Sequence, residues 1–355
     1  MQHPFLLYIT ILQKLFQFHG GNSQLTMNGL ISGRQIKFPL FNFASVIVLA
    51  AHMAKKLIHK SLFGVFLFFS YLPSWFLYIL ADINAFLLYY VIRYRRKVVS
   101  QNLEIAFPEM DKKERKKIGK KFYRDFCEHF SETIKLLTIS KKQLQSMFDA
   151  DYSVIEKLNS EGKCCYILLG HQFNWELANA HMSSLYDTRN IVAYLPVLNE
   201  FFDQLLIRIR TRFGAVLTPS DKLLRGIFPY RNETYNVVLM ADQNPSDMSR
   251  AYWIKFFDRQ VPFFKGPEKG ARAGNNPVTF VTIEKVKRGR YRIKTFLLAE
   301  EPKHALESSI TFQYSSKLED SIRNSPSNYL WSHRRWRFAR EDFNTVEMKS
   351  HYSEG

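Results

Sequence analysis

Residues 164–176 read CCYILLGHQFNWE, and this stretch decides the fold. An apolar run of this length that ends at a glycine predicts a buried β-strand over residues 164–170. The residues that follow, 172–186, have the pattern of a helix. His171 therefore leaves the end of a buried strand, and Glu176 follows five positions later, in the first turns of the next helix.

The alternation of strand and helix patterns continues downstream. Further apolar runs predict strands at 191–196, 235–243, 278–286 and 291–300. Apolar residues at helical spacing predict a helix that has Asn199 as its N-cap and ends at Gly214. This alternation predicts an α/β fold, with a mainly parallel twisted sheet flanked by helices. Active residues of such sheets lie at the carboxyl ends of strands, where His171 and Asp242 both fall.

Composition and charge narrow the class of protein. The 355 residues are 46% hydrophobic and 23% charged, which excludes disorder of the whole chain. The net charge of +18 favours a polyanionic partner: nucleic acid, anionic lipid or an acidic protein. Zinc-finger spacing and RNA-binding motifs are absent from the sequence, so we expect no nucleic-acid partner. The cysteines (Cys127, Cys164 and Cys165) have no disulfide pattern, which favours a reduced compartment facing the cytoplasm.

An apolar segment near the N-terminus predicts membrane attachment. Leu62–Ile92 contains no basic residue and one acid, Asp82, and is longer than the roughly 20 residues that cross a bilayer. Pro73 divides it, and Asp82 within a span costs about 2.5 to 3.5 kcal/mol. Basic residues flank it on both sides, so orientation is open. A tilted span and a re-entrant hairpin both fit, and a pair of buried helices is the soluble alternative.

The patterns divide the chain into five parts. Met53 precedes a basic stretch that leads into the apolar segment, so we expect Met53 to be the natural start and residues 1–52 to be an upstream extension. The other predicted parts are a membrane anchor at 53–97, a basic helical region at 98–150, a catalytic domain at 151–345 and a tail at 346–355.

The basic region contains a long amphipathic helix. Asp111 and Glu114 have the spacing of a capping box, which marks the helix start. One apolar stripe follows, formed by Ile118, Phe122, Phe126, Phe130, Ile134 and Leu137. We expect this helix to lie on anionic lipid, with a solvated charged face as the alternative.

The spacing of His171 and Glu176 alone does not identify a site, because ten histidines make one such spacing expected by chance. The position at a strand end is the stronger signal. There, Glu176 is expected to point back to Nδ1 of His171, fix the tautomer and leave Nε2 free to accept a proton.

The ordered motifs GHQFNWELAN, ADQNPSD, FFDRQVPFFKGPEKGARAGNNPVTFV and YLWSHRRWR resemble the lipid A late acyltransferases, within the lysophospholipid acyltransferase superfamily. The resemblance covers about residues 60–340. It implies an O-acyltransferase that moves a fatty acyl chain from an acyl carrier protein to a lipid A precursor hydroxyl, at the cytoplasmic side of a bacterial inner membrane. It also implies that His171 is the general base, that Glu176 orients it, and that Asp242 and Gln243 shape the site.

One position departs from the family pattern. Leu195 stands where the family commonly has a basic residue, so we expect Arg208 and Arg212, which share a helix face, to bind substrate instead, with Arg210 pointing elsewhere. His333 is expected to be structural or to face the headgroup. Cys164 and Cys165 are expected in the core.

Neither a nucleotide loop nor metal-ligand spacing is present in the sequence, so we expect no cofactor and no metal. Two alternatives stay open. One is acyl transfer to a glycolipid, lysophospholipid or aminolipid, and the other is a non-catalytic membrane-binding protein.

Overall fold

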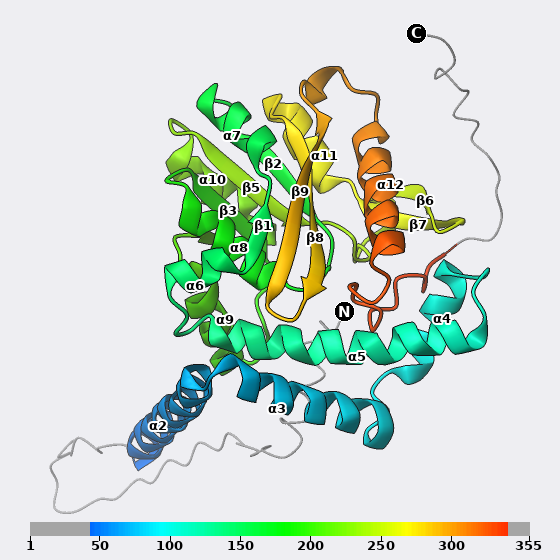
Figure 1. Ribbon diagram of the computed structural model, residues 1–355. Coiled ribbons are helices and arrows are strands. Elements are labelled where there is room, and N and C mark those ends of the chain that lie inside the picture. Colours follow the sequence, from blue (N-terminus) through cyan, green and yellow to red (C-terminus); the bar gives the residue numbers. More distant parts are fainter. Residues whose placement is uncertain (1–42, 340–355) are drawn as a thin grey trace, which may run out of the picture.

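A computed structural model describes residues 43–339, with side chains from residue 51 onward (Figure 1). The predicted extension before residue 43 and the tail from residue 346 lie outside the described residues. The centre is a seven-stranded sheet in the order β1-β9-β8-β2-β5-β3-β4. Its strands are β1 (Phe148–Ala150), β2 (Cys165–Leu169), β3 (Arg189–Tyr194), β4 (Val216–Pro219), β5 (Tyr235–Met240), β8 (Val278–Lys287) and β9 (Arg290–Ala299).

Strands β8, β2, β5, β3 and β4 are parallel, while β9 runs antiparallel to β8 and pairs with β1 in parallel. The predicted α/β class with a mainly parallel sheet is confirmed. A separate antiparallel pair, β6 (Ala251–Phe256) and β7 (Arg259–Phe264), lies beside this sheet.

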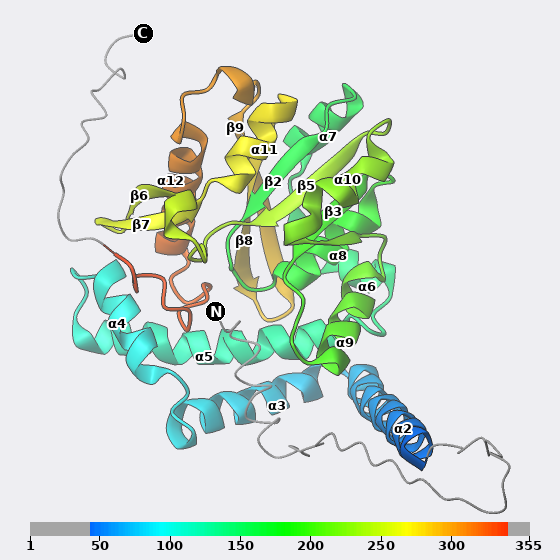
Figure 2. The same ribbon diagram turned by 180° about the vertical axis from the view of Figure 1, so that it is seen from behind.

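Helices flank both faces of the sheet (Figures 1 and 2). They are α6 (Lys141–Ser146), α7 (Ser153–Ser160), α8 (Trp175–Leu185), α9 (Glu200–Thr211), α10 (Leu223–Ile227), α11 (Gly266–Gly274) and α12 (Ser309–Asn324). Asn199 caps α9, accepting a bond from the Phe202 amide at 3.2 Å, and the chain turns out of the helix at Gly214 with φ of +100°. Both predicted helix ends are confirmed.

Strand β2 is buried along its whole length and separates two parts of the core. Tyr166 and Leu168 belong to a cluster that includes apolar residues of α12. Ile167 and Leu169 belong to a second cluster, which includes residues of α7, α8 and α9. A strand with apolar side chains on both faces is typical of the middle of a parallel sheet.

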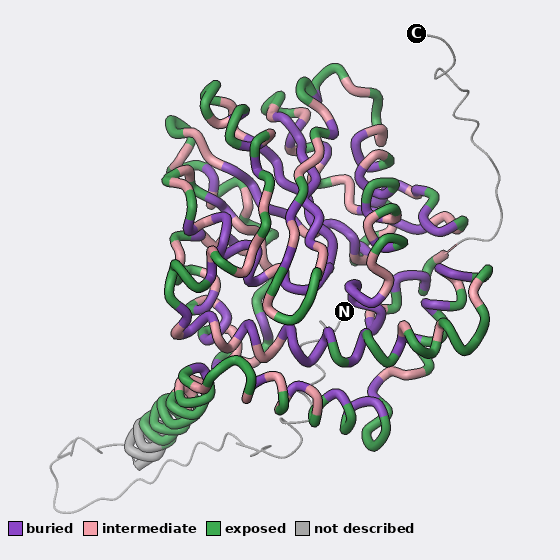
Figure 3. Tube along the Cα trace, viewed as in Figure 1, coloured by how far each residue is buried: buried purple, intermediate pink, exposed green. Residues whose placement is uncertain are grey.

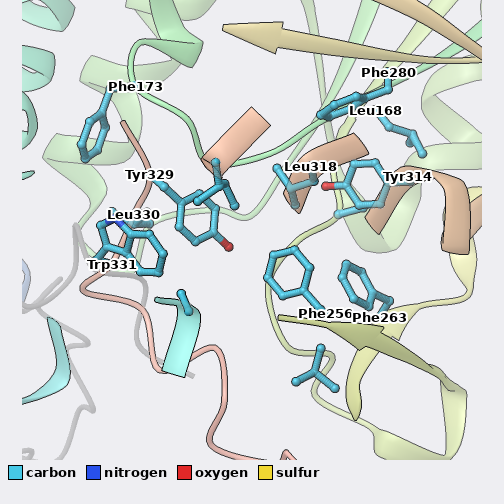
Figure 4. Packing of buried hydrophobic residues seen from close by; sticks show 14 of the residues in the cluster. Leu168, Phe173, Phe256, Phe263, Phe280, Tyr314, Leu318, Tyr329, Leu330 and Trp331 are labelled. Carbon is cyan, nitrogen blue, oxygen red and sulfur yellow. The ribbon is translucent and has the colours of Figure 1, made fainter. Parts of the chain in front are cut away.

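The segment after α12 packs aromatic side chains next to the end of β2. Figure 4 shows Tyr329 and Trp331 between Phe173 on one side and Phe256 on the other. Trp331 is fully buried, and the amide of Leu330 donates to the carbonyl oxygen of His171 at 3.1 Å. This C-terminal segment therefore holds the residue at which the strand ends.

The N-terminal helices are α2 (Phe43–Tyr71), α3 (Ser74–Phe86), α4 (Arg96–Ala106) and α5 (Lys112–Lys135), and a π-helical segment, η1 (Leu87–Val91), continues α3. The break at Pro73 falls where the sequence predicts it. Helix α5 crosses the lower end of the sheet, and α3 lies alongside it (Figures 1 and 2). Within the described residues, Ser74–Val91 is the one helical stretch long and apolar enough to cross a membrane, by length and composition alone.

The capping box of α5 is present as predicted, because the Asp111 side chain and the Glu114 side chain each accept from the other's amide. The expectation that its apolar stripe lies on lipid is wrong. Phe122 and Phe126 are buried against Phe173 and belong to the core, so the exposed side of α5 is its basic side. Periodicity identifies an apolar face and does not say what covers it.

We predict that Gly170→Ala destabilises the protein by about 1–3 kcal/mol, because the added methyl group would overlap Cδ1 of the buried Leu318. Adding Leu318→Ala should recover part of this loss. Urea unfolding measures both effects. Gly64→Ala is the matched control, since a methyl group there meets nothing within 4 Å. Equal stability of the Gly170→Ala and Gly64→Ala variants would contradict the packing.

Candidate active site

His171 lies directly after β2 and is held at two points by one carboxylate. Its Nδ1 is 2.6 Å from Oδ1 of Asp242, and its backbone amide donates to Oδ2 of Asp242 at 2.9 Å. Asp242 follows β5, the parallel neighbour of β2. His171 is 7% exposed and Asp242 is 1% exposed, so water competes little for these bonds. Both backbone and ring of the histidine are therefore fixed.

Gln243 contacts the other side of the same imidazole. Its Nε2 lies 3.0 Å from Nε2 of His171. An amide nitrogen donates, so Nε2 of the ring accepts and Nδ1 carries the proton that is shared with Asp242. The two neighbours favour the tautomer in which Nε2 has its lone pair free for an incoming proton.

Asp242 is kept charged by hydrogen bonds from His171 and by the positive charge of Arg335. Burial alone would raise the pKa of this carboxyl, but His171 and the nearby Arg335 guanidinium outweigh burial and hold the pKa below its usual value. Arg335 is itself buried. Its Nη1 donates to Oδ1 of Asn244 at 2.6 Å and to the Pro262 carbonyl at 2.9 Å. Asp242 is thus ionised at neutral pH.

Glu176 has a different partner from the one expected. Its carboxylate accepts from Nε of Arg210 at 2.9 Å and from Nη2 at 2.6 Å, and it also accepts from Nε1 of Trp175 at 3.0 Å. The expected contact with Nδ1 of His171 is wrong, because Asp242 occupies that position. Glu176 lies on the side of α8 that packs against α9, so its carboxylate meets Arg210 of that helix.

The arginines of α9 also differ from expectation. Arg210 is the one that reaches the buried Glu176. Arg208 is exposed, with its guanidinium 4.4 Å from the ring centroid of Phe63. Arg212 donates to the carbonyls of Leu136 and Ile139 at 2.7 Å each, beyond the end of α5. The structure does not bring Arg208 or Arg212 to His171, and their substrate-binding role stays a prediction.

A polar network supports the loop between β2 and α8. Oδ1 of Asn174 contacts Nδ1 of His129 at 2.6 Å, and its Nδ2 donates to the buried Glu132. Glu132 also accepts from the hydroxyl of Tyr291, and from that of Tyr78 on α3 at 2.7 Å. Burial lowers the pKa of His129 to about 4, so this histidine is neutral. The loop after His171 is thereby tied to α5, β9 and α3.

The remaining predicted positions are structural in their surroundings. His333 is half-buried, and the partial burial of its ring together with the nearby Arg335 lowers its pKa to about 3. Cys165 is buried, which raises its thiol pKa to about 12, whereas Cys164 is half-buried at the start of the strand. Leu195 is exposed and supplies no charge. Among the side chains of residues 51–339, His, Cys, Asp and Glu form no group of three or more that could hold a metal ion.

Residues 52–338 match the family model described as bacterial lipid A biosynthesis acyltransferase, which is well over half of the chain. The chain belongs to this family. It is therefore an acyltransferase, and the resemblance seen in the sequence motifs is confirmed. A search of curated proteins found no match.

Sequence reasoning missed Arg210, Glu132 and Asn174. Arg210 sits on a helix whose basic residues at 208, 210 and 212 look alike in sequence, and only the packing of α9 on α8 separates them. Glu132 lies in a strongly charged helix, where a buried acid has no distinctive signal. Asn174 lies three residues after His171 in the HQFNWE stretch, and this closeness in sequence was the one signal that could have identified it as part of the site.

We predict that Arg210→Leu costs about 3–5 kcal/mol at pH 7, because it leaves the Glu176 carboxylate buried without its partner. In the native protein, burial alone would raise the pKa of Glu176. The charge and hydrogen bonds of Arg210 more than offset this effect, so the pKa of Glu176 lies below its usual value. The pair's contribution is full above the ordinary pKa of a glutamate and is lost as pH falls through the folded pKa.

In Arg210→Leu the lowering effect of the guanidinium is gone, so burial raises the pKa of Glu176 above its ordinary value. The buried carboxylate of the variant therefore takes a proton as the pH falls from 7 toward 4, and the deficit should shrink over this range, as followed by urea unfolding at several pH values. Arg208→Leu is the matched control on the same helix, and it should cost at most about 1 kcal/mol. An Arg210→Leu deficit that is below 1 kcal/mol at pH 7, or independent of pH, would show that the ion pair is not as described.

Proposed function

We propose that this acyltransferase moves a fatty acyl chain from an acyl carrier protein thioester to a hydroxyl of a lipid A precursor, on the cytoplasmic side of a bacterial inner membrane. The observation that carries the proposal is the geometry of His171. Its Nδ1 is held by a buried carboxylate, and its Nε2 faces a hydrogen-bond donor at 3.0 Å, where a substrate hydroxyl can replace that donor.

His171 acts as the general base. Nε2 accepts the proton of the acceptor hydroxyl while its oxygen attacks the thioester carbonyl, and a C–O bond forms. The imidazolium is stabilised by Asp242, which does not itself take the proton. When the tetrahedral intermediate collapses, the C–S bond breaks and the proton passes from Nε2 to the departing sulfur. Asp242 is thus the orienting carboxylate in this mechanism.

Glu176 acts through Arg210. Nε and Nη2 of Arg210 are used by Glu176, which fixes the plane of the guanidinium and leaves Nη1 outside the pair. A half-buried, pre-oriented cation is suited to the tetrahedral oxyanion or to a substrate phosphate. In this way Arg210 supplies the charge that Leu195 lacks.

The surface of the chain fits the proposed partners. Acyl carrier proteins are acidic and lipid A precursors carry phosphates, and a net charge of +18 attracts both. The N-terminal helices leave large apolar side chains exposed, among them Ile58, Leu62 and Phe68 of α2 (Figure 3). Exposed apolar residues at this density are expected where a protein contacts a membrane.

Mass spectrometry of lipid A from strains with and without the gene tests the acceptor. We predict that the deletion strain lacks one secondary acyl chain and that the native gene restores it, whereas His171→Ala does not. Unchanged lipid A with a missing acyl group on another lipid would assign a different acceptor. Full restoration by His171→Ala would rule out the catalytic role of this residue.

We predict that Asp242→Asn lowers kcat by about 10²–10⁴-fold with little change in KM, because the amide no longer fixes the tautomer or stabilises the imidazolium. Steady-state kinetics on purified protein measure this. Asp247→Asn is the matched control, since Asp247 is an exposed acid of the same loop. An Asp242→Asn variant that keeps more than a third of the native kcat would contradict the assignment.

A further inference from the structure

Helix α3 with η1 is apolar enough to cross a bilayer, but its surroundings prevent it from doing so. It runs antiparallel to α5, in side-chain contact from Tyr78 with Glu132 to Tyr90 with Lys120. Tyr89 packs against Tyr123 of α5 within this span, at 5.3 Å between ring centroids. Two helices joined in this way enter or stay out of the hydrocarbon layer together.

Helix α5 cannot enter hydrocarbon. Its exposed side carries a row of cations, Lys116, Lys117, Lys120, Lys121 and Arg124. Moving one cation to the centre of a bilayer lowers partition by about 100-fold. The acid of α3 adds to this, because Asp82 is paired with Arg288 of the β8–β9 hairpin and lies 3.3 Å from Nε of Arg124. If α3 crossed the membrane, the charged cluster of Asp82, Arg124 and Arg288 would have to enter the membrane with it, together with part of the catalytic domain.

The outer side of α3 is nevertheless apolar and uncovered in the described residues. Trp75, Ile79, Ile83, Leu87 and Val91 follow one another at intervals of four, and each is between 39% and 63% exposed. Residues at this spacing form one stripe along a helix. Figure 3 shows this outer side as exposed over the length of the helix, while the side that faces α5 is largely buried.

The ends and edges of this stripe have the chemistry of a lipid headgroup layer. Trp75 begins it and Tyr90 lies at its other end, and these two residue types prefer the membrane–water interface. Lys120 lies 5.5 Å from the Tyr90 ring centroid, and Arg96 lies 4.4 Å from that of Tyr89, so cations border the apolar residues. A cationic border beside an apolar stripe matches an anionic bilayer surface.

We propose that α3 and η1 lie in the plane of an anionic membrane surface, with the stripe Trp75–Ile79–Ile83–Leu87–Val91 in the headgroup and upper acyl region, and do not cross the bilayer. The catalytic loop is then held at a fixed height, because Tyr78 on the inner side of α3 bonds the same Glu132 that binds Asn174. The inference rests on the proposed function only in taking the membrane as the source of the lipid acceptor.

Depth-dependent quenching of single fluorescent labels tests the orientation. The full chain, with Cys164→Ser to remove the accessible thiol, receives a bimane label at Ile79→Cys, Ile83→Cys or Val91→Cys. Ser160→Cys on α7, at the far end of the domain in Figure 1, is the matched exposed control. Vesicles contain phosphatidylglycerol and lipids with nitroxides at a shallow or a deep acyl position.

We expect equal, shallow quenching at positions 79, 83 and 91 and none at 160. A crossing helix would instead place positions 79 and 91 about 18 Å apart in depth, giving graded quenching, and that result would overturn the proposal. Absence of quenching at all three positions on bound protein would also overturn it. A disulfide between two unlabelled Ile83→Cys chains under mild oxidation would show a second copy as the occupant and would overturn it as well.

Vesicle partition of Lys120→Gln tests the cationic border. It should be roughly fivefold weaker than that of the native chain on phosphatidylglycerol vesicles and unchanged on phosphatidylcholine vesicles. Equal binding of the native chain to both vesicles would overturn the anionic preference. These measurements need no turnover, so they can succeed or fail independently of an acyl transfer assay on the same vesicles.

Discussion

One buried carboxylate determines how the active site is built. Asp242 accepts from both the backbone amide and Nδ1 of His171, so a single side chain fixes where strand β2 ends and how the imidazole is turned. The register of the sheet makes this possible. Leu169 of β2 pairs with Met240 of β5, and parallel neighbours deliver the residues that follow them to the same edge. A charge this deeply buried needs compensation, which the two hydrogen bonds from His171 and the nearby guanidinium of Arg335 supply.

Much of the fold could be predicted from the sequence, because it rests on local patterns. The apolar runs predicted five of the seven strands of the main sheet, and Asn199 and the pair Asp111–Glu114 predicted helix starts. The short strands β1 and β4, and the β6–β7 pair, were not predicted. Strands of three or four residues, such as β1 and β4, carry too little periodicity to be separated from loops.

The site could be predicted only in part. His171 and Asp242 were found because their signal is positional, at the ends of buried strands. The partner of His171 was not predicted. Glu176 is five residues away in sequence and Asp242 is 71 residues away, and only the register of the sheet shows that Asp242 is the one in contact. Similarly, sequence spacing predicts that Arg208 and Arg212 share one face of α9. It does not predict which face meets Glu176, because that depends on how α9 packs against α8. Long-range packing decided every one of these assignments.

Buried polar groups connect the apolar helix α3 to the loop after His171 through Glu132, so the proposed membrane contact and the proposed general base share one support. The central claim is that Asp242 fixes the reactive tautomer of His171. The 15N chemical shifts of its imidazole, assigned by comparison with His171→Gln, test this most directly. At neutral pH in the resting enzyme, Nδ1 should be protonated and Nε2 unprotonated, and Asp242→Asn should disturb this preference. Protonation at Nε2, or a tautomer unaffected by Asp242→Asn, would contradict the account.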